Sequence, residues 1–203
     1  MLQFSAAPDA LERLQIPDAD LRYAPAIELG TPADALLRSL IDTIAWRSES
    51  IVLWGRTYAQ PRLIAWYGDE GKHYTYSGLT LVPQPWTPLL TQIKERVEEL
   101  TTVQFNSVLL NYYRDGNDSM GMHSDDEPEL GPNPVIASLS LGAERTFILK
   151  HRTKRETKPL HLQLSSGSLL LMQGETQTHW KHGIAKEKRA CGPRVNLNFR
   201  RIV

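Results

Sequence analysis

A histidine and a carboxylate lie two positions apart, at His123 and Asp125. Side chains alternate between the two faces of a β-strand, so this spacing predicts that both point to the same face of one strand. Further along the chain, residues 179–182 (HWKH) offer a second imidazole, from either His179 or His182. Two imidazoles and one carboxylate on one side of a metal leave the opposite coordination positions open, which is the arrangement of non-haem Fe(II) oxygenases. The residue types therefore predict an Fe(II) site that substrate and oxygen can reach.

Two other interpretations of the acidic segment around His123 compete with this one. A histidine two residues before an aspartate also occurs by chance in surface loops. Asp115, Asn117 and Ser119 are spaced like ligands of a calcium loop, but that loop requires glycine at its sixth position for a sharp turn. Met120 stands at that position, so calcium is disfavoured.

Polar and apolar residues alternate strictly near the end of the chain, which predicts a strand with one polar face. The polar face carries Arg194, Asn196, Asn198 and Arg200, and the apolar face carries Val195, Leu197 and Phe199. Two buried arginines are costly unless anions meet them, and guanidinium groups bind carboxylates through a bidentate fork. A dicarboxylate such as 2-oxoglutarate offers one carboxylate to each arginine. A solvated edge strand is the alternative that this strand alone leaves open.

Short β-like runs follow one another from residue 105, separated by Gly, Pro or polar clusters. They cover 105–113, 135–141, 145–150, 160–164, 168–173 and 194–202. This pattern predicts a barrel or sandwich, in which Asn111 and Tyr113 share one strand face. Thr31 and Thr87 each precede a proline and a stripe of apolar residues at helical spacing, which predicts two scaffold helices with hydroxyl N-caps. Residues 1–33, interrupted by prolines, are expected to form an arm without regular elements on a single domain, 34–203.

The composition limits the class of protein. Lys plus Arg and Asp plus Glu are equal at 23 each, so any nucleic-acid binding must come from local patches. The single cysteine excludes an internal disulfide. The N-terminus lacks a signal-peptide pattern, and no apolar run approaches the roughly 18 residues of a membrane span. We therefore expect a cytoplasmic monomer without membrane contact, or a nuclear one in a eukaryote.

Two segments suggest contacts with nucleic acid. Aromatic residues are concentrated between 54 and 76, where a lid that grips a base between flat side chains is favoured over a core sheet. These aromatics are Trp54, Tyr58, Trp66, Tyr67, Tyr74 and Tyr76. The basic stretch from Lys150 to Lys158 predicts a hairpin tip that contacts phosphates, joined by Arg62 and the cations of 186–189. An ordinary solvated hairpin is the alternative.

Taken together, these motifs resemble the AlkB family of nucleic-acid dealkylating dioxygenases. The resemblance runs from about Ile51 to Ile202, through PRLIAWYGD, YTYSGLTL, LLNYYRDGNDSMGMHSDDE, PVIASLSLGAERTFIL, GSLLLMQGETQTHWKHGI and PRVNLNFR. It implies a fold that is mainly β with flanking helices (α+β), built on a double-stranded β-helix, or jelly-roll, core. It also implies His123, Asp125 and His182 as the iron ligands, with His179 outside the motif.

The resemblance assigns the other site residues as well. It implies that Arg194 binds the distal carboxylate of 2-oxoglutarate and that Arg200 lies near the iron-chelating one. Asn111, Tyr113 and Asn196 would make further polar contacts with this co-substrate.

The implied activity is oxidative demethylation of alkylated DNA bases of the N1-methyladenine and N3-methylcytosine type, a direct-reversal repair that uses Fe(II), 2-oxoglutarate and O2. Residues 50–80 would form the nucleotide-recognition lid. Tyr76 would stack on the flipped base across from His123, with Tyr74 and Glu127 near its edge and Trp54 filling the gap in a duplex. RNA demethylation or protein hydroxylation by the same superfamily is the first alternative, and a jelly-roll binding module without turnover is the second.

Overall fold

The computed structural model describes residues 9–53, 56–76 and 79–203, with the backbone alone for 51–53, 56, 76 and 79. The strands are β1 (Glu12–Leu14), β2 (Asp20–Ala24), β3 (Ser50–Leu53), β4 (Arg56–Ala59), β5 (Leu63–Gly68), β6 (Tyr74–Tyr76), β7 (Leu79–Leu81), β8 (Ser107–Tyr113), β9 (Met120–His123), β10 (Ile136–Gly142), β11 (Arg145–His151), β12 (Leu160–Leu164), β13 (Leu169–Gln173), β14 (Trp180–Ile184) and β15 (Arg194–Arg200). The helices are α1 (Ala33–Thr43), α2 (Pro88–Thr101), the single turn α3 (Thr176–His179) and the 3₁₀ turn η1 (Pro128–Leu130). All strands expected after residue 105 are present within two residues of their predicted ends.

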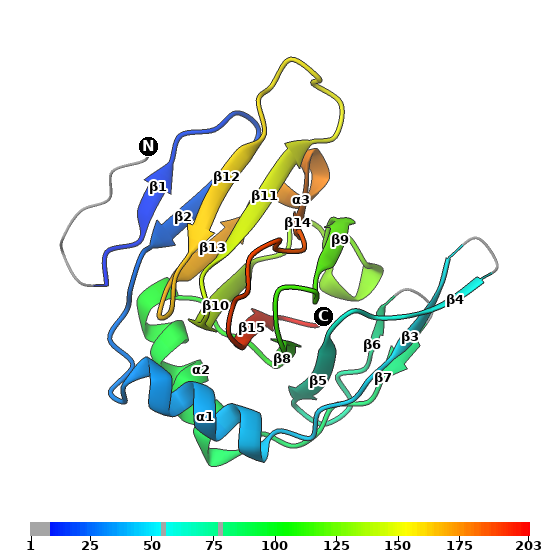
Figure 1. Cartoon of the computed structure of the whole chain (residues 1–203). Coiled ribbons are helices and arrows are strands. Elements are labelled where there is room, and N and C mark those ends of the chain that lie inside the picture. Colours follow the sequence, from blue (N-terminus) through cyan, green and yellow to red (C-terminus); the bar gives the residue numbers. More distant parts are fainter. Residues whose placement is uncertain (1–8, 54–55, 77–78) are drawn as a thin grey trace.

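Two antiparallel sheets form the body of the molecule (Figure 1). The larger has the order β1-β2-β13-β10-β15-β8-β5, and the smaller has the order β12-β11-β14-β9. Apart from the pairs β1–β2 and β11–β12, the neighbouring strands of both sheets are not consecutive in sequence, as in a double-stranded β-helix. The predicted fold class, mainly β with a jelly-roll core, is confirmed.

Apolar side chains fill the space on both sides of the larger sheet. One cluster lies between the two sheets and includes Phe147, Leu170 and Trp180. The other lies between the larger sheet and the helices α1 and α2, which pack beneath it (Figure 1). The apolar face of β15 belongs to this second cluster, so the polar face of β15 is turned toward the space between the sheets.

The expectation that residues 1–33 contain no regular element is wrong for residues 12–24. β2 pairs with β13, with Tyr23 opposite Leu170, and so extends the larger sheet. Burial explains this pairing, since Leu21 and Tyr23 are 0% and 2% exposed and the Tyr23 hydroxyl donates to the Gln163 carbonyl. The strands are too short and too close to prolines for their periodicity to be recognised.

The two scaffold helices differ at their starts. The Leu90 amide donates to Thr87 Oγ1 at 3.2 Å, which confirms the predicted N-cap of α2. In α1 the cap residue is Pro32, whose carbonyl accepts from the first turn, and Thr31 makes no capping bond. The predicted Thr31 cap is therefore wrong by one residue. Within the described ranges, no helix combines the length and the apolar character that crossing a bilayer demands.

Candidate functional site

Three side chains converge between the two sheets. They are His123 at the end of β9, Asp125 in the loop that follows it, and His182 in β14. His123 and His182 are opposite each other across β9 and β14, with ring centroids 4.3 Å apart. Asp125 Oδ1 lies 3.9 Å from His123 Nε2, and Asp125 Oδ2 lies 3.7 Å from His182 Nε2. The three ligand atoms lie within 4.8 Å of one another, which is close enough to share one metal ion. Two imidazoles and one carboxylate are the donor set that suits Fe(II).

The ring of His123 is held in the tautomer that a metal requires. Its Nδ1 lies 3.0 Å from the Gly121 carbonyl. A carbonyl can only accept, so Nδ1 carries the proton and the lone pair of Nε2 is left for a metal. Nε2 is also the atom that faces Asp125.

The sequence spacing predicts that Asp125 and His123 share one strand face. This prediction is wrong, because β9 ends at His123. The carboxylate reaches the site from the following loop and accepts a hydrogen bond from Arg200 Nη2 at 2.7 Å. Both partners of this ion pair are buried, at about 2% exposure. Arg200 therefore fixes the orientation of the carboxylate that faces the two histidines.

A glycine allows β9 and β14, the two strands next to the candidate metal centre, to lie close to each other. A Cβ atom on Gly183, next to His182, would lie 2.8 Å from the Met120 carbonyl oxygen and 3.0 Å from that of Gly121. Such contacts are too short for any side chain, so only glycine lets β14 lie this close to β9. The approach places His182 beside His123.

Burial sets the charge states of the group. It lowers the pKa of His182 to about 3, so this imidazole stays neutral, as a metal ligand must. Burial likewise lowers the pKa of His123. Burial alone would raise the pKa of Asp125, but the positive charge of Arg200 outweighs it and holds that pKa below its ordinary value. The site therefore presents one carboxylate and two neutral imidazoles.

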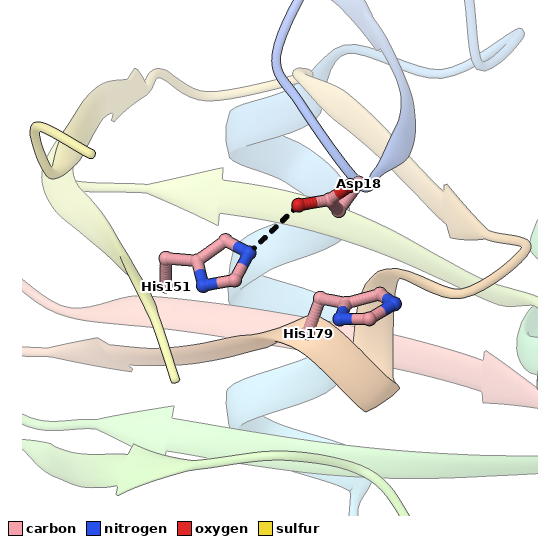
Figure 2. A group of neighbouring side chains, drawn as sticks. All are labelled: Asp18, His151 and His179. Atoms are coloured by element: carbon pink, nitrogen blue, oxygen red, sulfur yellow. Dashed lines mark hydrogen bonds and ion pairs between the residues drawn. The ribbon is translucent and has the colours of Figure 1, made fainter. Parts of the chain in front are cut away.

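His179, which the residue pattern alone could not distinguish from His182, belongs to a different cluster. Figure 2 shows it beside His151 and Asp18, near the start of β14. His151 Nδ1 accepts from the backbone N–H groups of Thr153 and Lys154, so its proton is on Nε2, which donates to Asp18 at 3.0 Å. This is the reverse of the His123 tautomer. A metal at this cluster would have to displace that proton.

A pocket beside the candidate metal centre has the character of an anion site. Arg194 is 1% exposed and donates from Nη2 to Ser140, while its Nε and Nη1 have no partner among the described residues. Its Cζ lies 5.0 Å from the centroid of the Tyr113 ring. Burial lowers the pKa of Arg194 from its ordinary value. A carboxylate would satisfy both nitrogens and offset this burial cost.

The two asparagines predicted to contact 2-oxoglutarate differ in what they can offer. Asn111 accepts from Arg62 Nε at 2.7 Å, and its Nδ2 has no partner among the described residues. Asn196 donates to Ser138 and Leu139 and accepts from Asn198. Asn111 therefore has a donor left for a ligand, whereas the amide of Asn196 is already engaged within the protein.

Arg145 is a further buried arginine, which the sequence pattern did not identify. Arg145 begins β11, is 1% exposed, and donates to the carbonyls of Asp118 and Ala185 in the loops after β8 and β14. Its Cζ lies 5.6 Å from the centroid of the Tyr113 ring. Arg145 lies two positions before Phe147, so both side chains point to the same, inward face of β11. This spacing could have placed Arg145 inside the sandwich.

Three of the six aromatics expected in the lid belong to the core. Trp66, Tyr67 and Tyr74 are 4%, 5% and 0% exposed, so the lid interpretation is wrong for their side chains. Trp66 stacks on Tyr74 at 4.9 Å and donates from its indole to the Lys72 carbonyl. Polar ends that bond within the protein offset the cost of burying such rings. Tyr58, on β4, is 45% exposed.

Glu127 and Tyr74 lie next to each other at the edge of the candidate metal centre. The ring of Tyr74 is 5.4 Å from Arg200 Cζ. Burial and the negative charge of Asp125 raise the pKa of Glu127, and burial raises the pKa of Tyr74. A polar pair therefore adjoins the three convergent side chains, and its contact with a bound base stays a prediction.

The other predicted substrate contacts have mixed outcomes. Arg62 is 3% exposed, so its expected membership of a surface phosphate patch is wrong. Trp54 and the side chain of Tyr76 lie outside the described residues. Lys150 and Lys158 are exposed near and within the turn between β11 and β12, as predicted.

Comparison with known proteins agrees with this geometry. A family model described as the 2OG-Fe(II) oxygenase superfamily matches residues 21–200. The chain is 44% identical over 180 residues to the DNA oxidative demethylase ALKBH2 of Mus musculus, covering 84% of this chain and 75% of that protein. It is 45% identical over 178 residues to the alpha-ketoglutarate-dependent dioxygenase alkB homolog 3 of the same organism, covering 84% of this chain and 62% of that protein.

The solved structure of OsALKBH1 matches with a TM-score of 0.60 at 16% identity, over 95% of this chain and all of that one, and so shares the fold. The family match covers all the strands of the smaller sheet, those of the larger sheet from β2 onward, and all three convergent side chains. The chain therefore belongs to the 2OG-Fe(II) oxygenase superfamily and, within it, to the AlkB family.

Proposed function

We propose that this protein is an Fe(II)- and 2-oxoglutarate-dependent dioxygenase that demethylates alkylated bases in DNA, of the N1-methyladenine and N3-methylcytosine type. The observation that carries the proposal is the convergence of His123, Asp125 and His182 beside a buried arginine, two of whose nitrogens have no partner in the part of the chain that the structure describes. The relative named as a DNA oxidative demethylase supports DNA as the substrate class.

In this proposal His123, Asp125 and His182 hold the iron, and Arg194 receives the distal carboxylate of 2-oxoglutarate. Arg200 holds Asp125 and lies near the other carboxylate of the co-substrate. When bound, iron and 2-oxoglutarate supply the oxidant that hydroxylates the N-alkyl carbon with O2, as succinate and CO2 form.

The protein has a limited part in the release of the hydroxylated alkyl group from the base. The hydroxylated carbon loses its hydroxyl proton and leaves as an aldehyde, while the base nitrogen keeps the electron pair of the broken C–N bond. No protein nucleophile is needed. Tyr74, Tyr76 and Glu127 would position the base across from His123, with the aromatic Tyr76 stacking on its face.

A substrate panel tests the proposal. Protein loaded with Fe(II) is incubated with 2-oxoglutarate, ascorbate and oligonucleotides that carry N1-methyladenine, N3-methylcytosine or etheno adducts, in single- and double-stranded DNA and RNA. Mass spectrometry is expected to show restored bases in DNA, with equal amounts of formaldehyde and succinate from the methylated substrates. Turnover on RNA or a peptide alone would overturn the substrate class. The absence of both succinate formation and oxygen consumption would favour a binding module.

The basic hairpin between β11 and β12 should contribute phosphate contacts. Arg152 and Lys154 already pair with Asp126 and Asp18, so Lys150, Arg155 and Lys158 are the residues to neutralise. Replacing these three with glutamine is expected to weaken DNA binding. The slope of log Kd against log salt concentration should also fall by roughly 0.9 for each duplex phosphate that the variant no longer neutralises. Arg38→Gln, on the exposed face of α1, is the control. An unchanged slope in the triple variant would remove the hairpin from the DNA interface.

Trp54 is proposed to fill the space that a flipped base leaves in a duplex. Trp54→Ala should therefore reduce kcat/KM on duplex DNA more than on a single strand of the same sequence, because a single strand has no stack to close. A base–aromatic stack is worth about 1–3 kcal/mol, which is roughly fivefold to a hundredfold. Equal reductions on the two substrates would refute this role.

A further inference from the structure

The aspartate of the candidate metal centre lies beyond the end of its strand, so sheet pairing does not hold its backbone. Contacts with the segment around α3 hold it instead. The Asp125 amide donates to Gln177 Oε1 at 3.0 Å, and the neighbouring Ser124 hydroxyl donates to the Trp180 carbonyl at 3.0 Å. The His-x-Asp loop is thereby tied to the turn that leads into β14.

The side-chain amide of Gln177 has only one orientation that satisfies its neighbours. The residue is 2% exposed, and its Nε2 donates to Met172 Sδ at 3.6 Å while its Oε1 accepts from Asp125. Rotating the amide by half a turn would place the NH2 group against the Asp125 N–H, donor against donor. The acceptor is therefore fixed toward Asp125.

Gln177 also connects the two segments that supply the ligands. It lies in α3, and α3 runs directly into β14, which carries His182. Two other side-chain contacts hold this loop. The bond from the Ser124 hydroxyl to the Trp180 carbonyl is also buried, whereas the Arg152–Asp126 pair is exposed, at 36% and 57% for the two side chains, and such pairs contribute little. Of the two buried contacts, the one with Gln177 bonds the backbone of Asp125 itself and links it to the segment that leads into the strand of His182.

We propose that Gln177 is a positioning residue that holds Asp125 in the geometry required for metal binding. The inference rests on the proposed iron site, and the affinity for a metal tests it without substrate or turnover. Partners of metal ligands typically change metal affinity by about 10–100-fold when they are removed. Gln177 differs from most of them because it acts on the backbone of the ligand rather than on its side chain.

The test is isothermal titration of Mn²⁺ into the metal-free full chain. Gln177→Met keeps the volume of the side chain but removes the acceptor, so Kd for Mn²⁺ is expected to rise by about 10–100-fold. Gln173→Met is the matched control, because Gln173 lies at the end of β13 and its amide donates to Asp20, away from the His-x-Asp loop. The control should have lower thermal stability and unchanged Mn²⁺ affinity.

Gln177→Glu is the conservative companion of Gln177→Met. It retains an acceptor oxygen, so its Kd should lie much closer to that of the wild type than to that of Gln177→Met. The inference would be overturned if Gln177→Met bound Mn²⁺ as tightly as the wild type. It would also be overturned if Gln173→Met or Gln177→Glu lost as much affinity as Gln177→Met. Failure of the wild type itself to bind Mn²⁺ would instead overturn the iron site of the proposed function.

Discussion

Asp125→Ala is expected to abolish metal binding and, with it, all measurable demethylation. The substitution removes the one anionic group among the three convergent side chains, so the effect should exceed the roughly 10–100-fold that removal of an outer partner costs. Titration of Mn²⁺ and single-turnover assays on methylated DNA would both measure it. Removal of one partner from the buried pair with Arg200 should also lower the free energy of unfolding, by about 3–5 kcal/mol.

Two companion variants separate these effects. Asp125→Asn keeps the shape of the side chain and its hydrogen bond to Arg200, so it should fold better than Asp125→Ala and still fail to bind metal. Asp42→Ala, on the exposed face of α1, should leave metal affinity and turnover unchanged. Turnover by a folded Asp125→Ala variant at even a tenth of the wild-type rate would contradict the assignment of Asp125 as an iron ligand.

Arg194→Ala is expected to raise the KM for 2-oxoglutarate while kcat at saturating co-substrate changes much less. A charge-assisted bidentate pair is worth about 1.5–3 kcal/mol, which corresponds to a rise of roughly tenfold to a hundredfold. Steady-state assays of succinate formation at varied 2-oxoglutarate would measure it. The structural reason for this expectation is that Nε and Nη1 of Arg194 have no partner among residues 9–53, 56–76 and 79–203.

A conservative variant and a neighbouring arginine give the controls. Arg194→Lys should recover part of the affinity, because an ammonium keeps the charge but not the planar fork. Arg201→Ala removes an exposed arginine just after the same strand and should leave the KM unchanged. A fall in kcat with an unaltered KM would place Arg194 in another role.

Regular alternation made much of the site predictable from the sequence. The 194–200 pattern identified both faces of β15, and the structure places its apolar residues under the helices and its polar residues beside the candidate metal centre. The two arginines of that face stood out because a buried cation without an anion is unfavourable. Periodicity succeeds here because β15 is a central strand with different surroundings on its two faces.

Other parts of the site depend on contacts that no local pattern encodes. Asp125 projects from a loop, Gln177 lies in a single helical turn, and the side chain of Tyr74 is buried by its stack on Trp66. The choice between His179 and His182 likewise rested on the family resemblance. In the structure it follows from strand register and from the hydrogen bonds that fix the His151 tautomer. The bond between Gln177 and Asp125 and the register of His182 with His123 join residues far apart in the sequence, so no local pattern reveals them.

A crystal structure of the protein with Mn²⁺ and 2-oxoglutarate under anaerobic conditions would test the central claim most directly. We predict one ion bonded to His123 Nε2, a carboxylate oxygen of Asp125 and an imidazole nitrogen of His182, with a carboxylate of 2-oxoglutarate paired to Arg194. An ion at Asp18, His151 and His179 instead, with none between His123 and His182, would contradict the account.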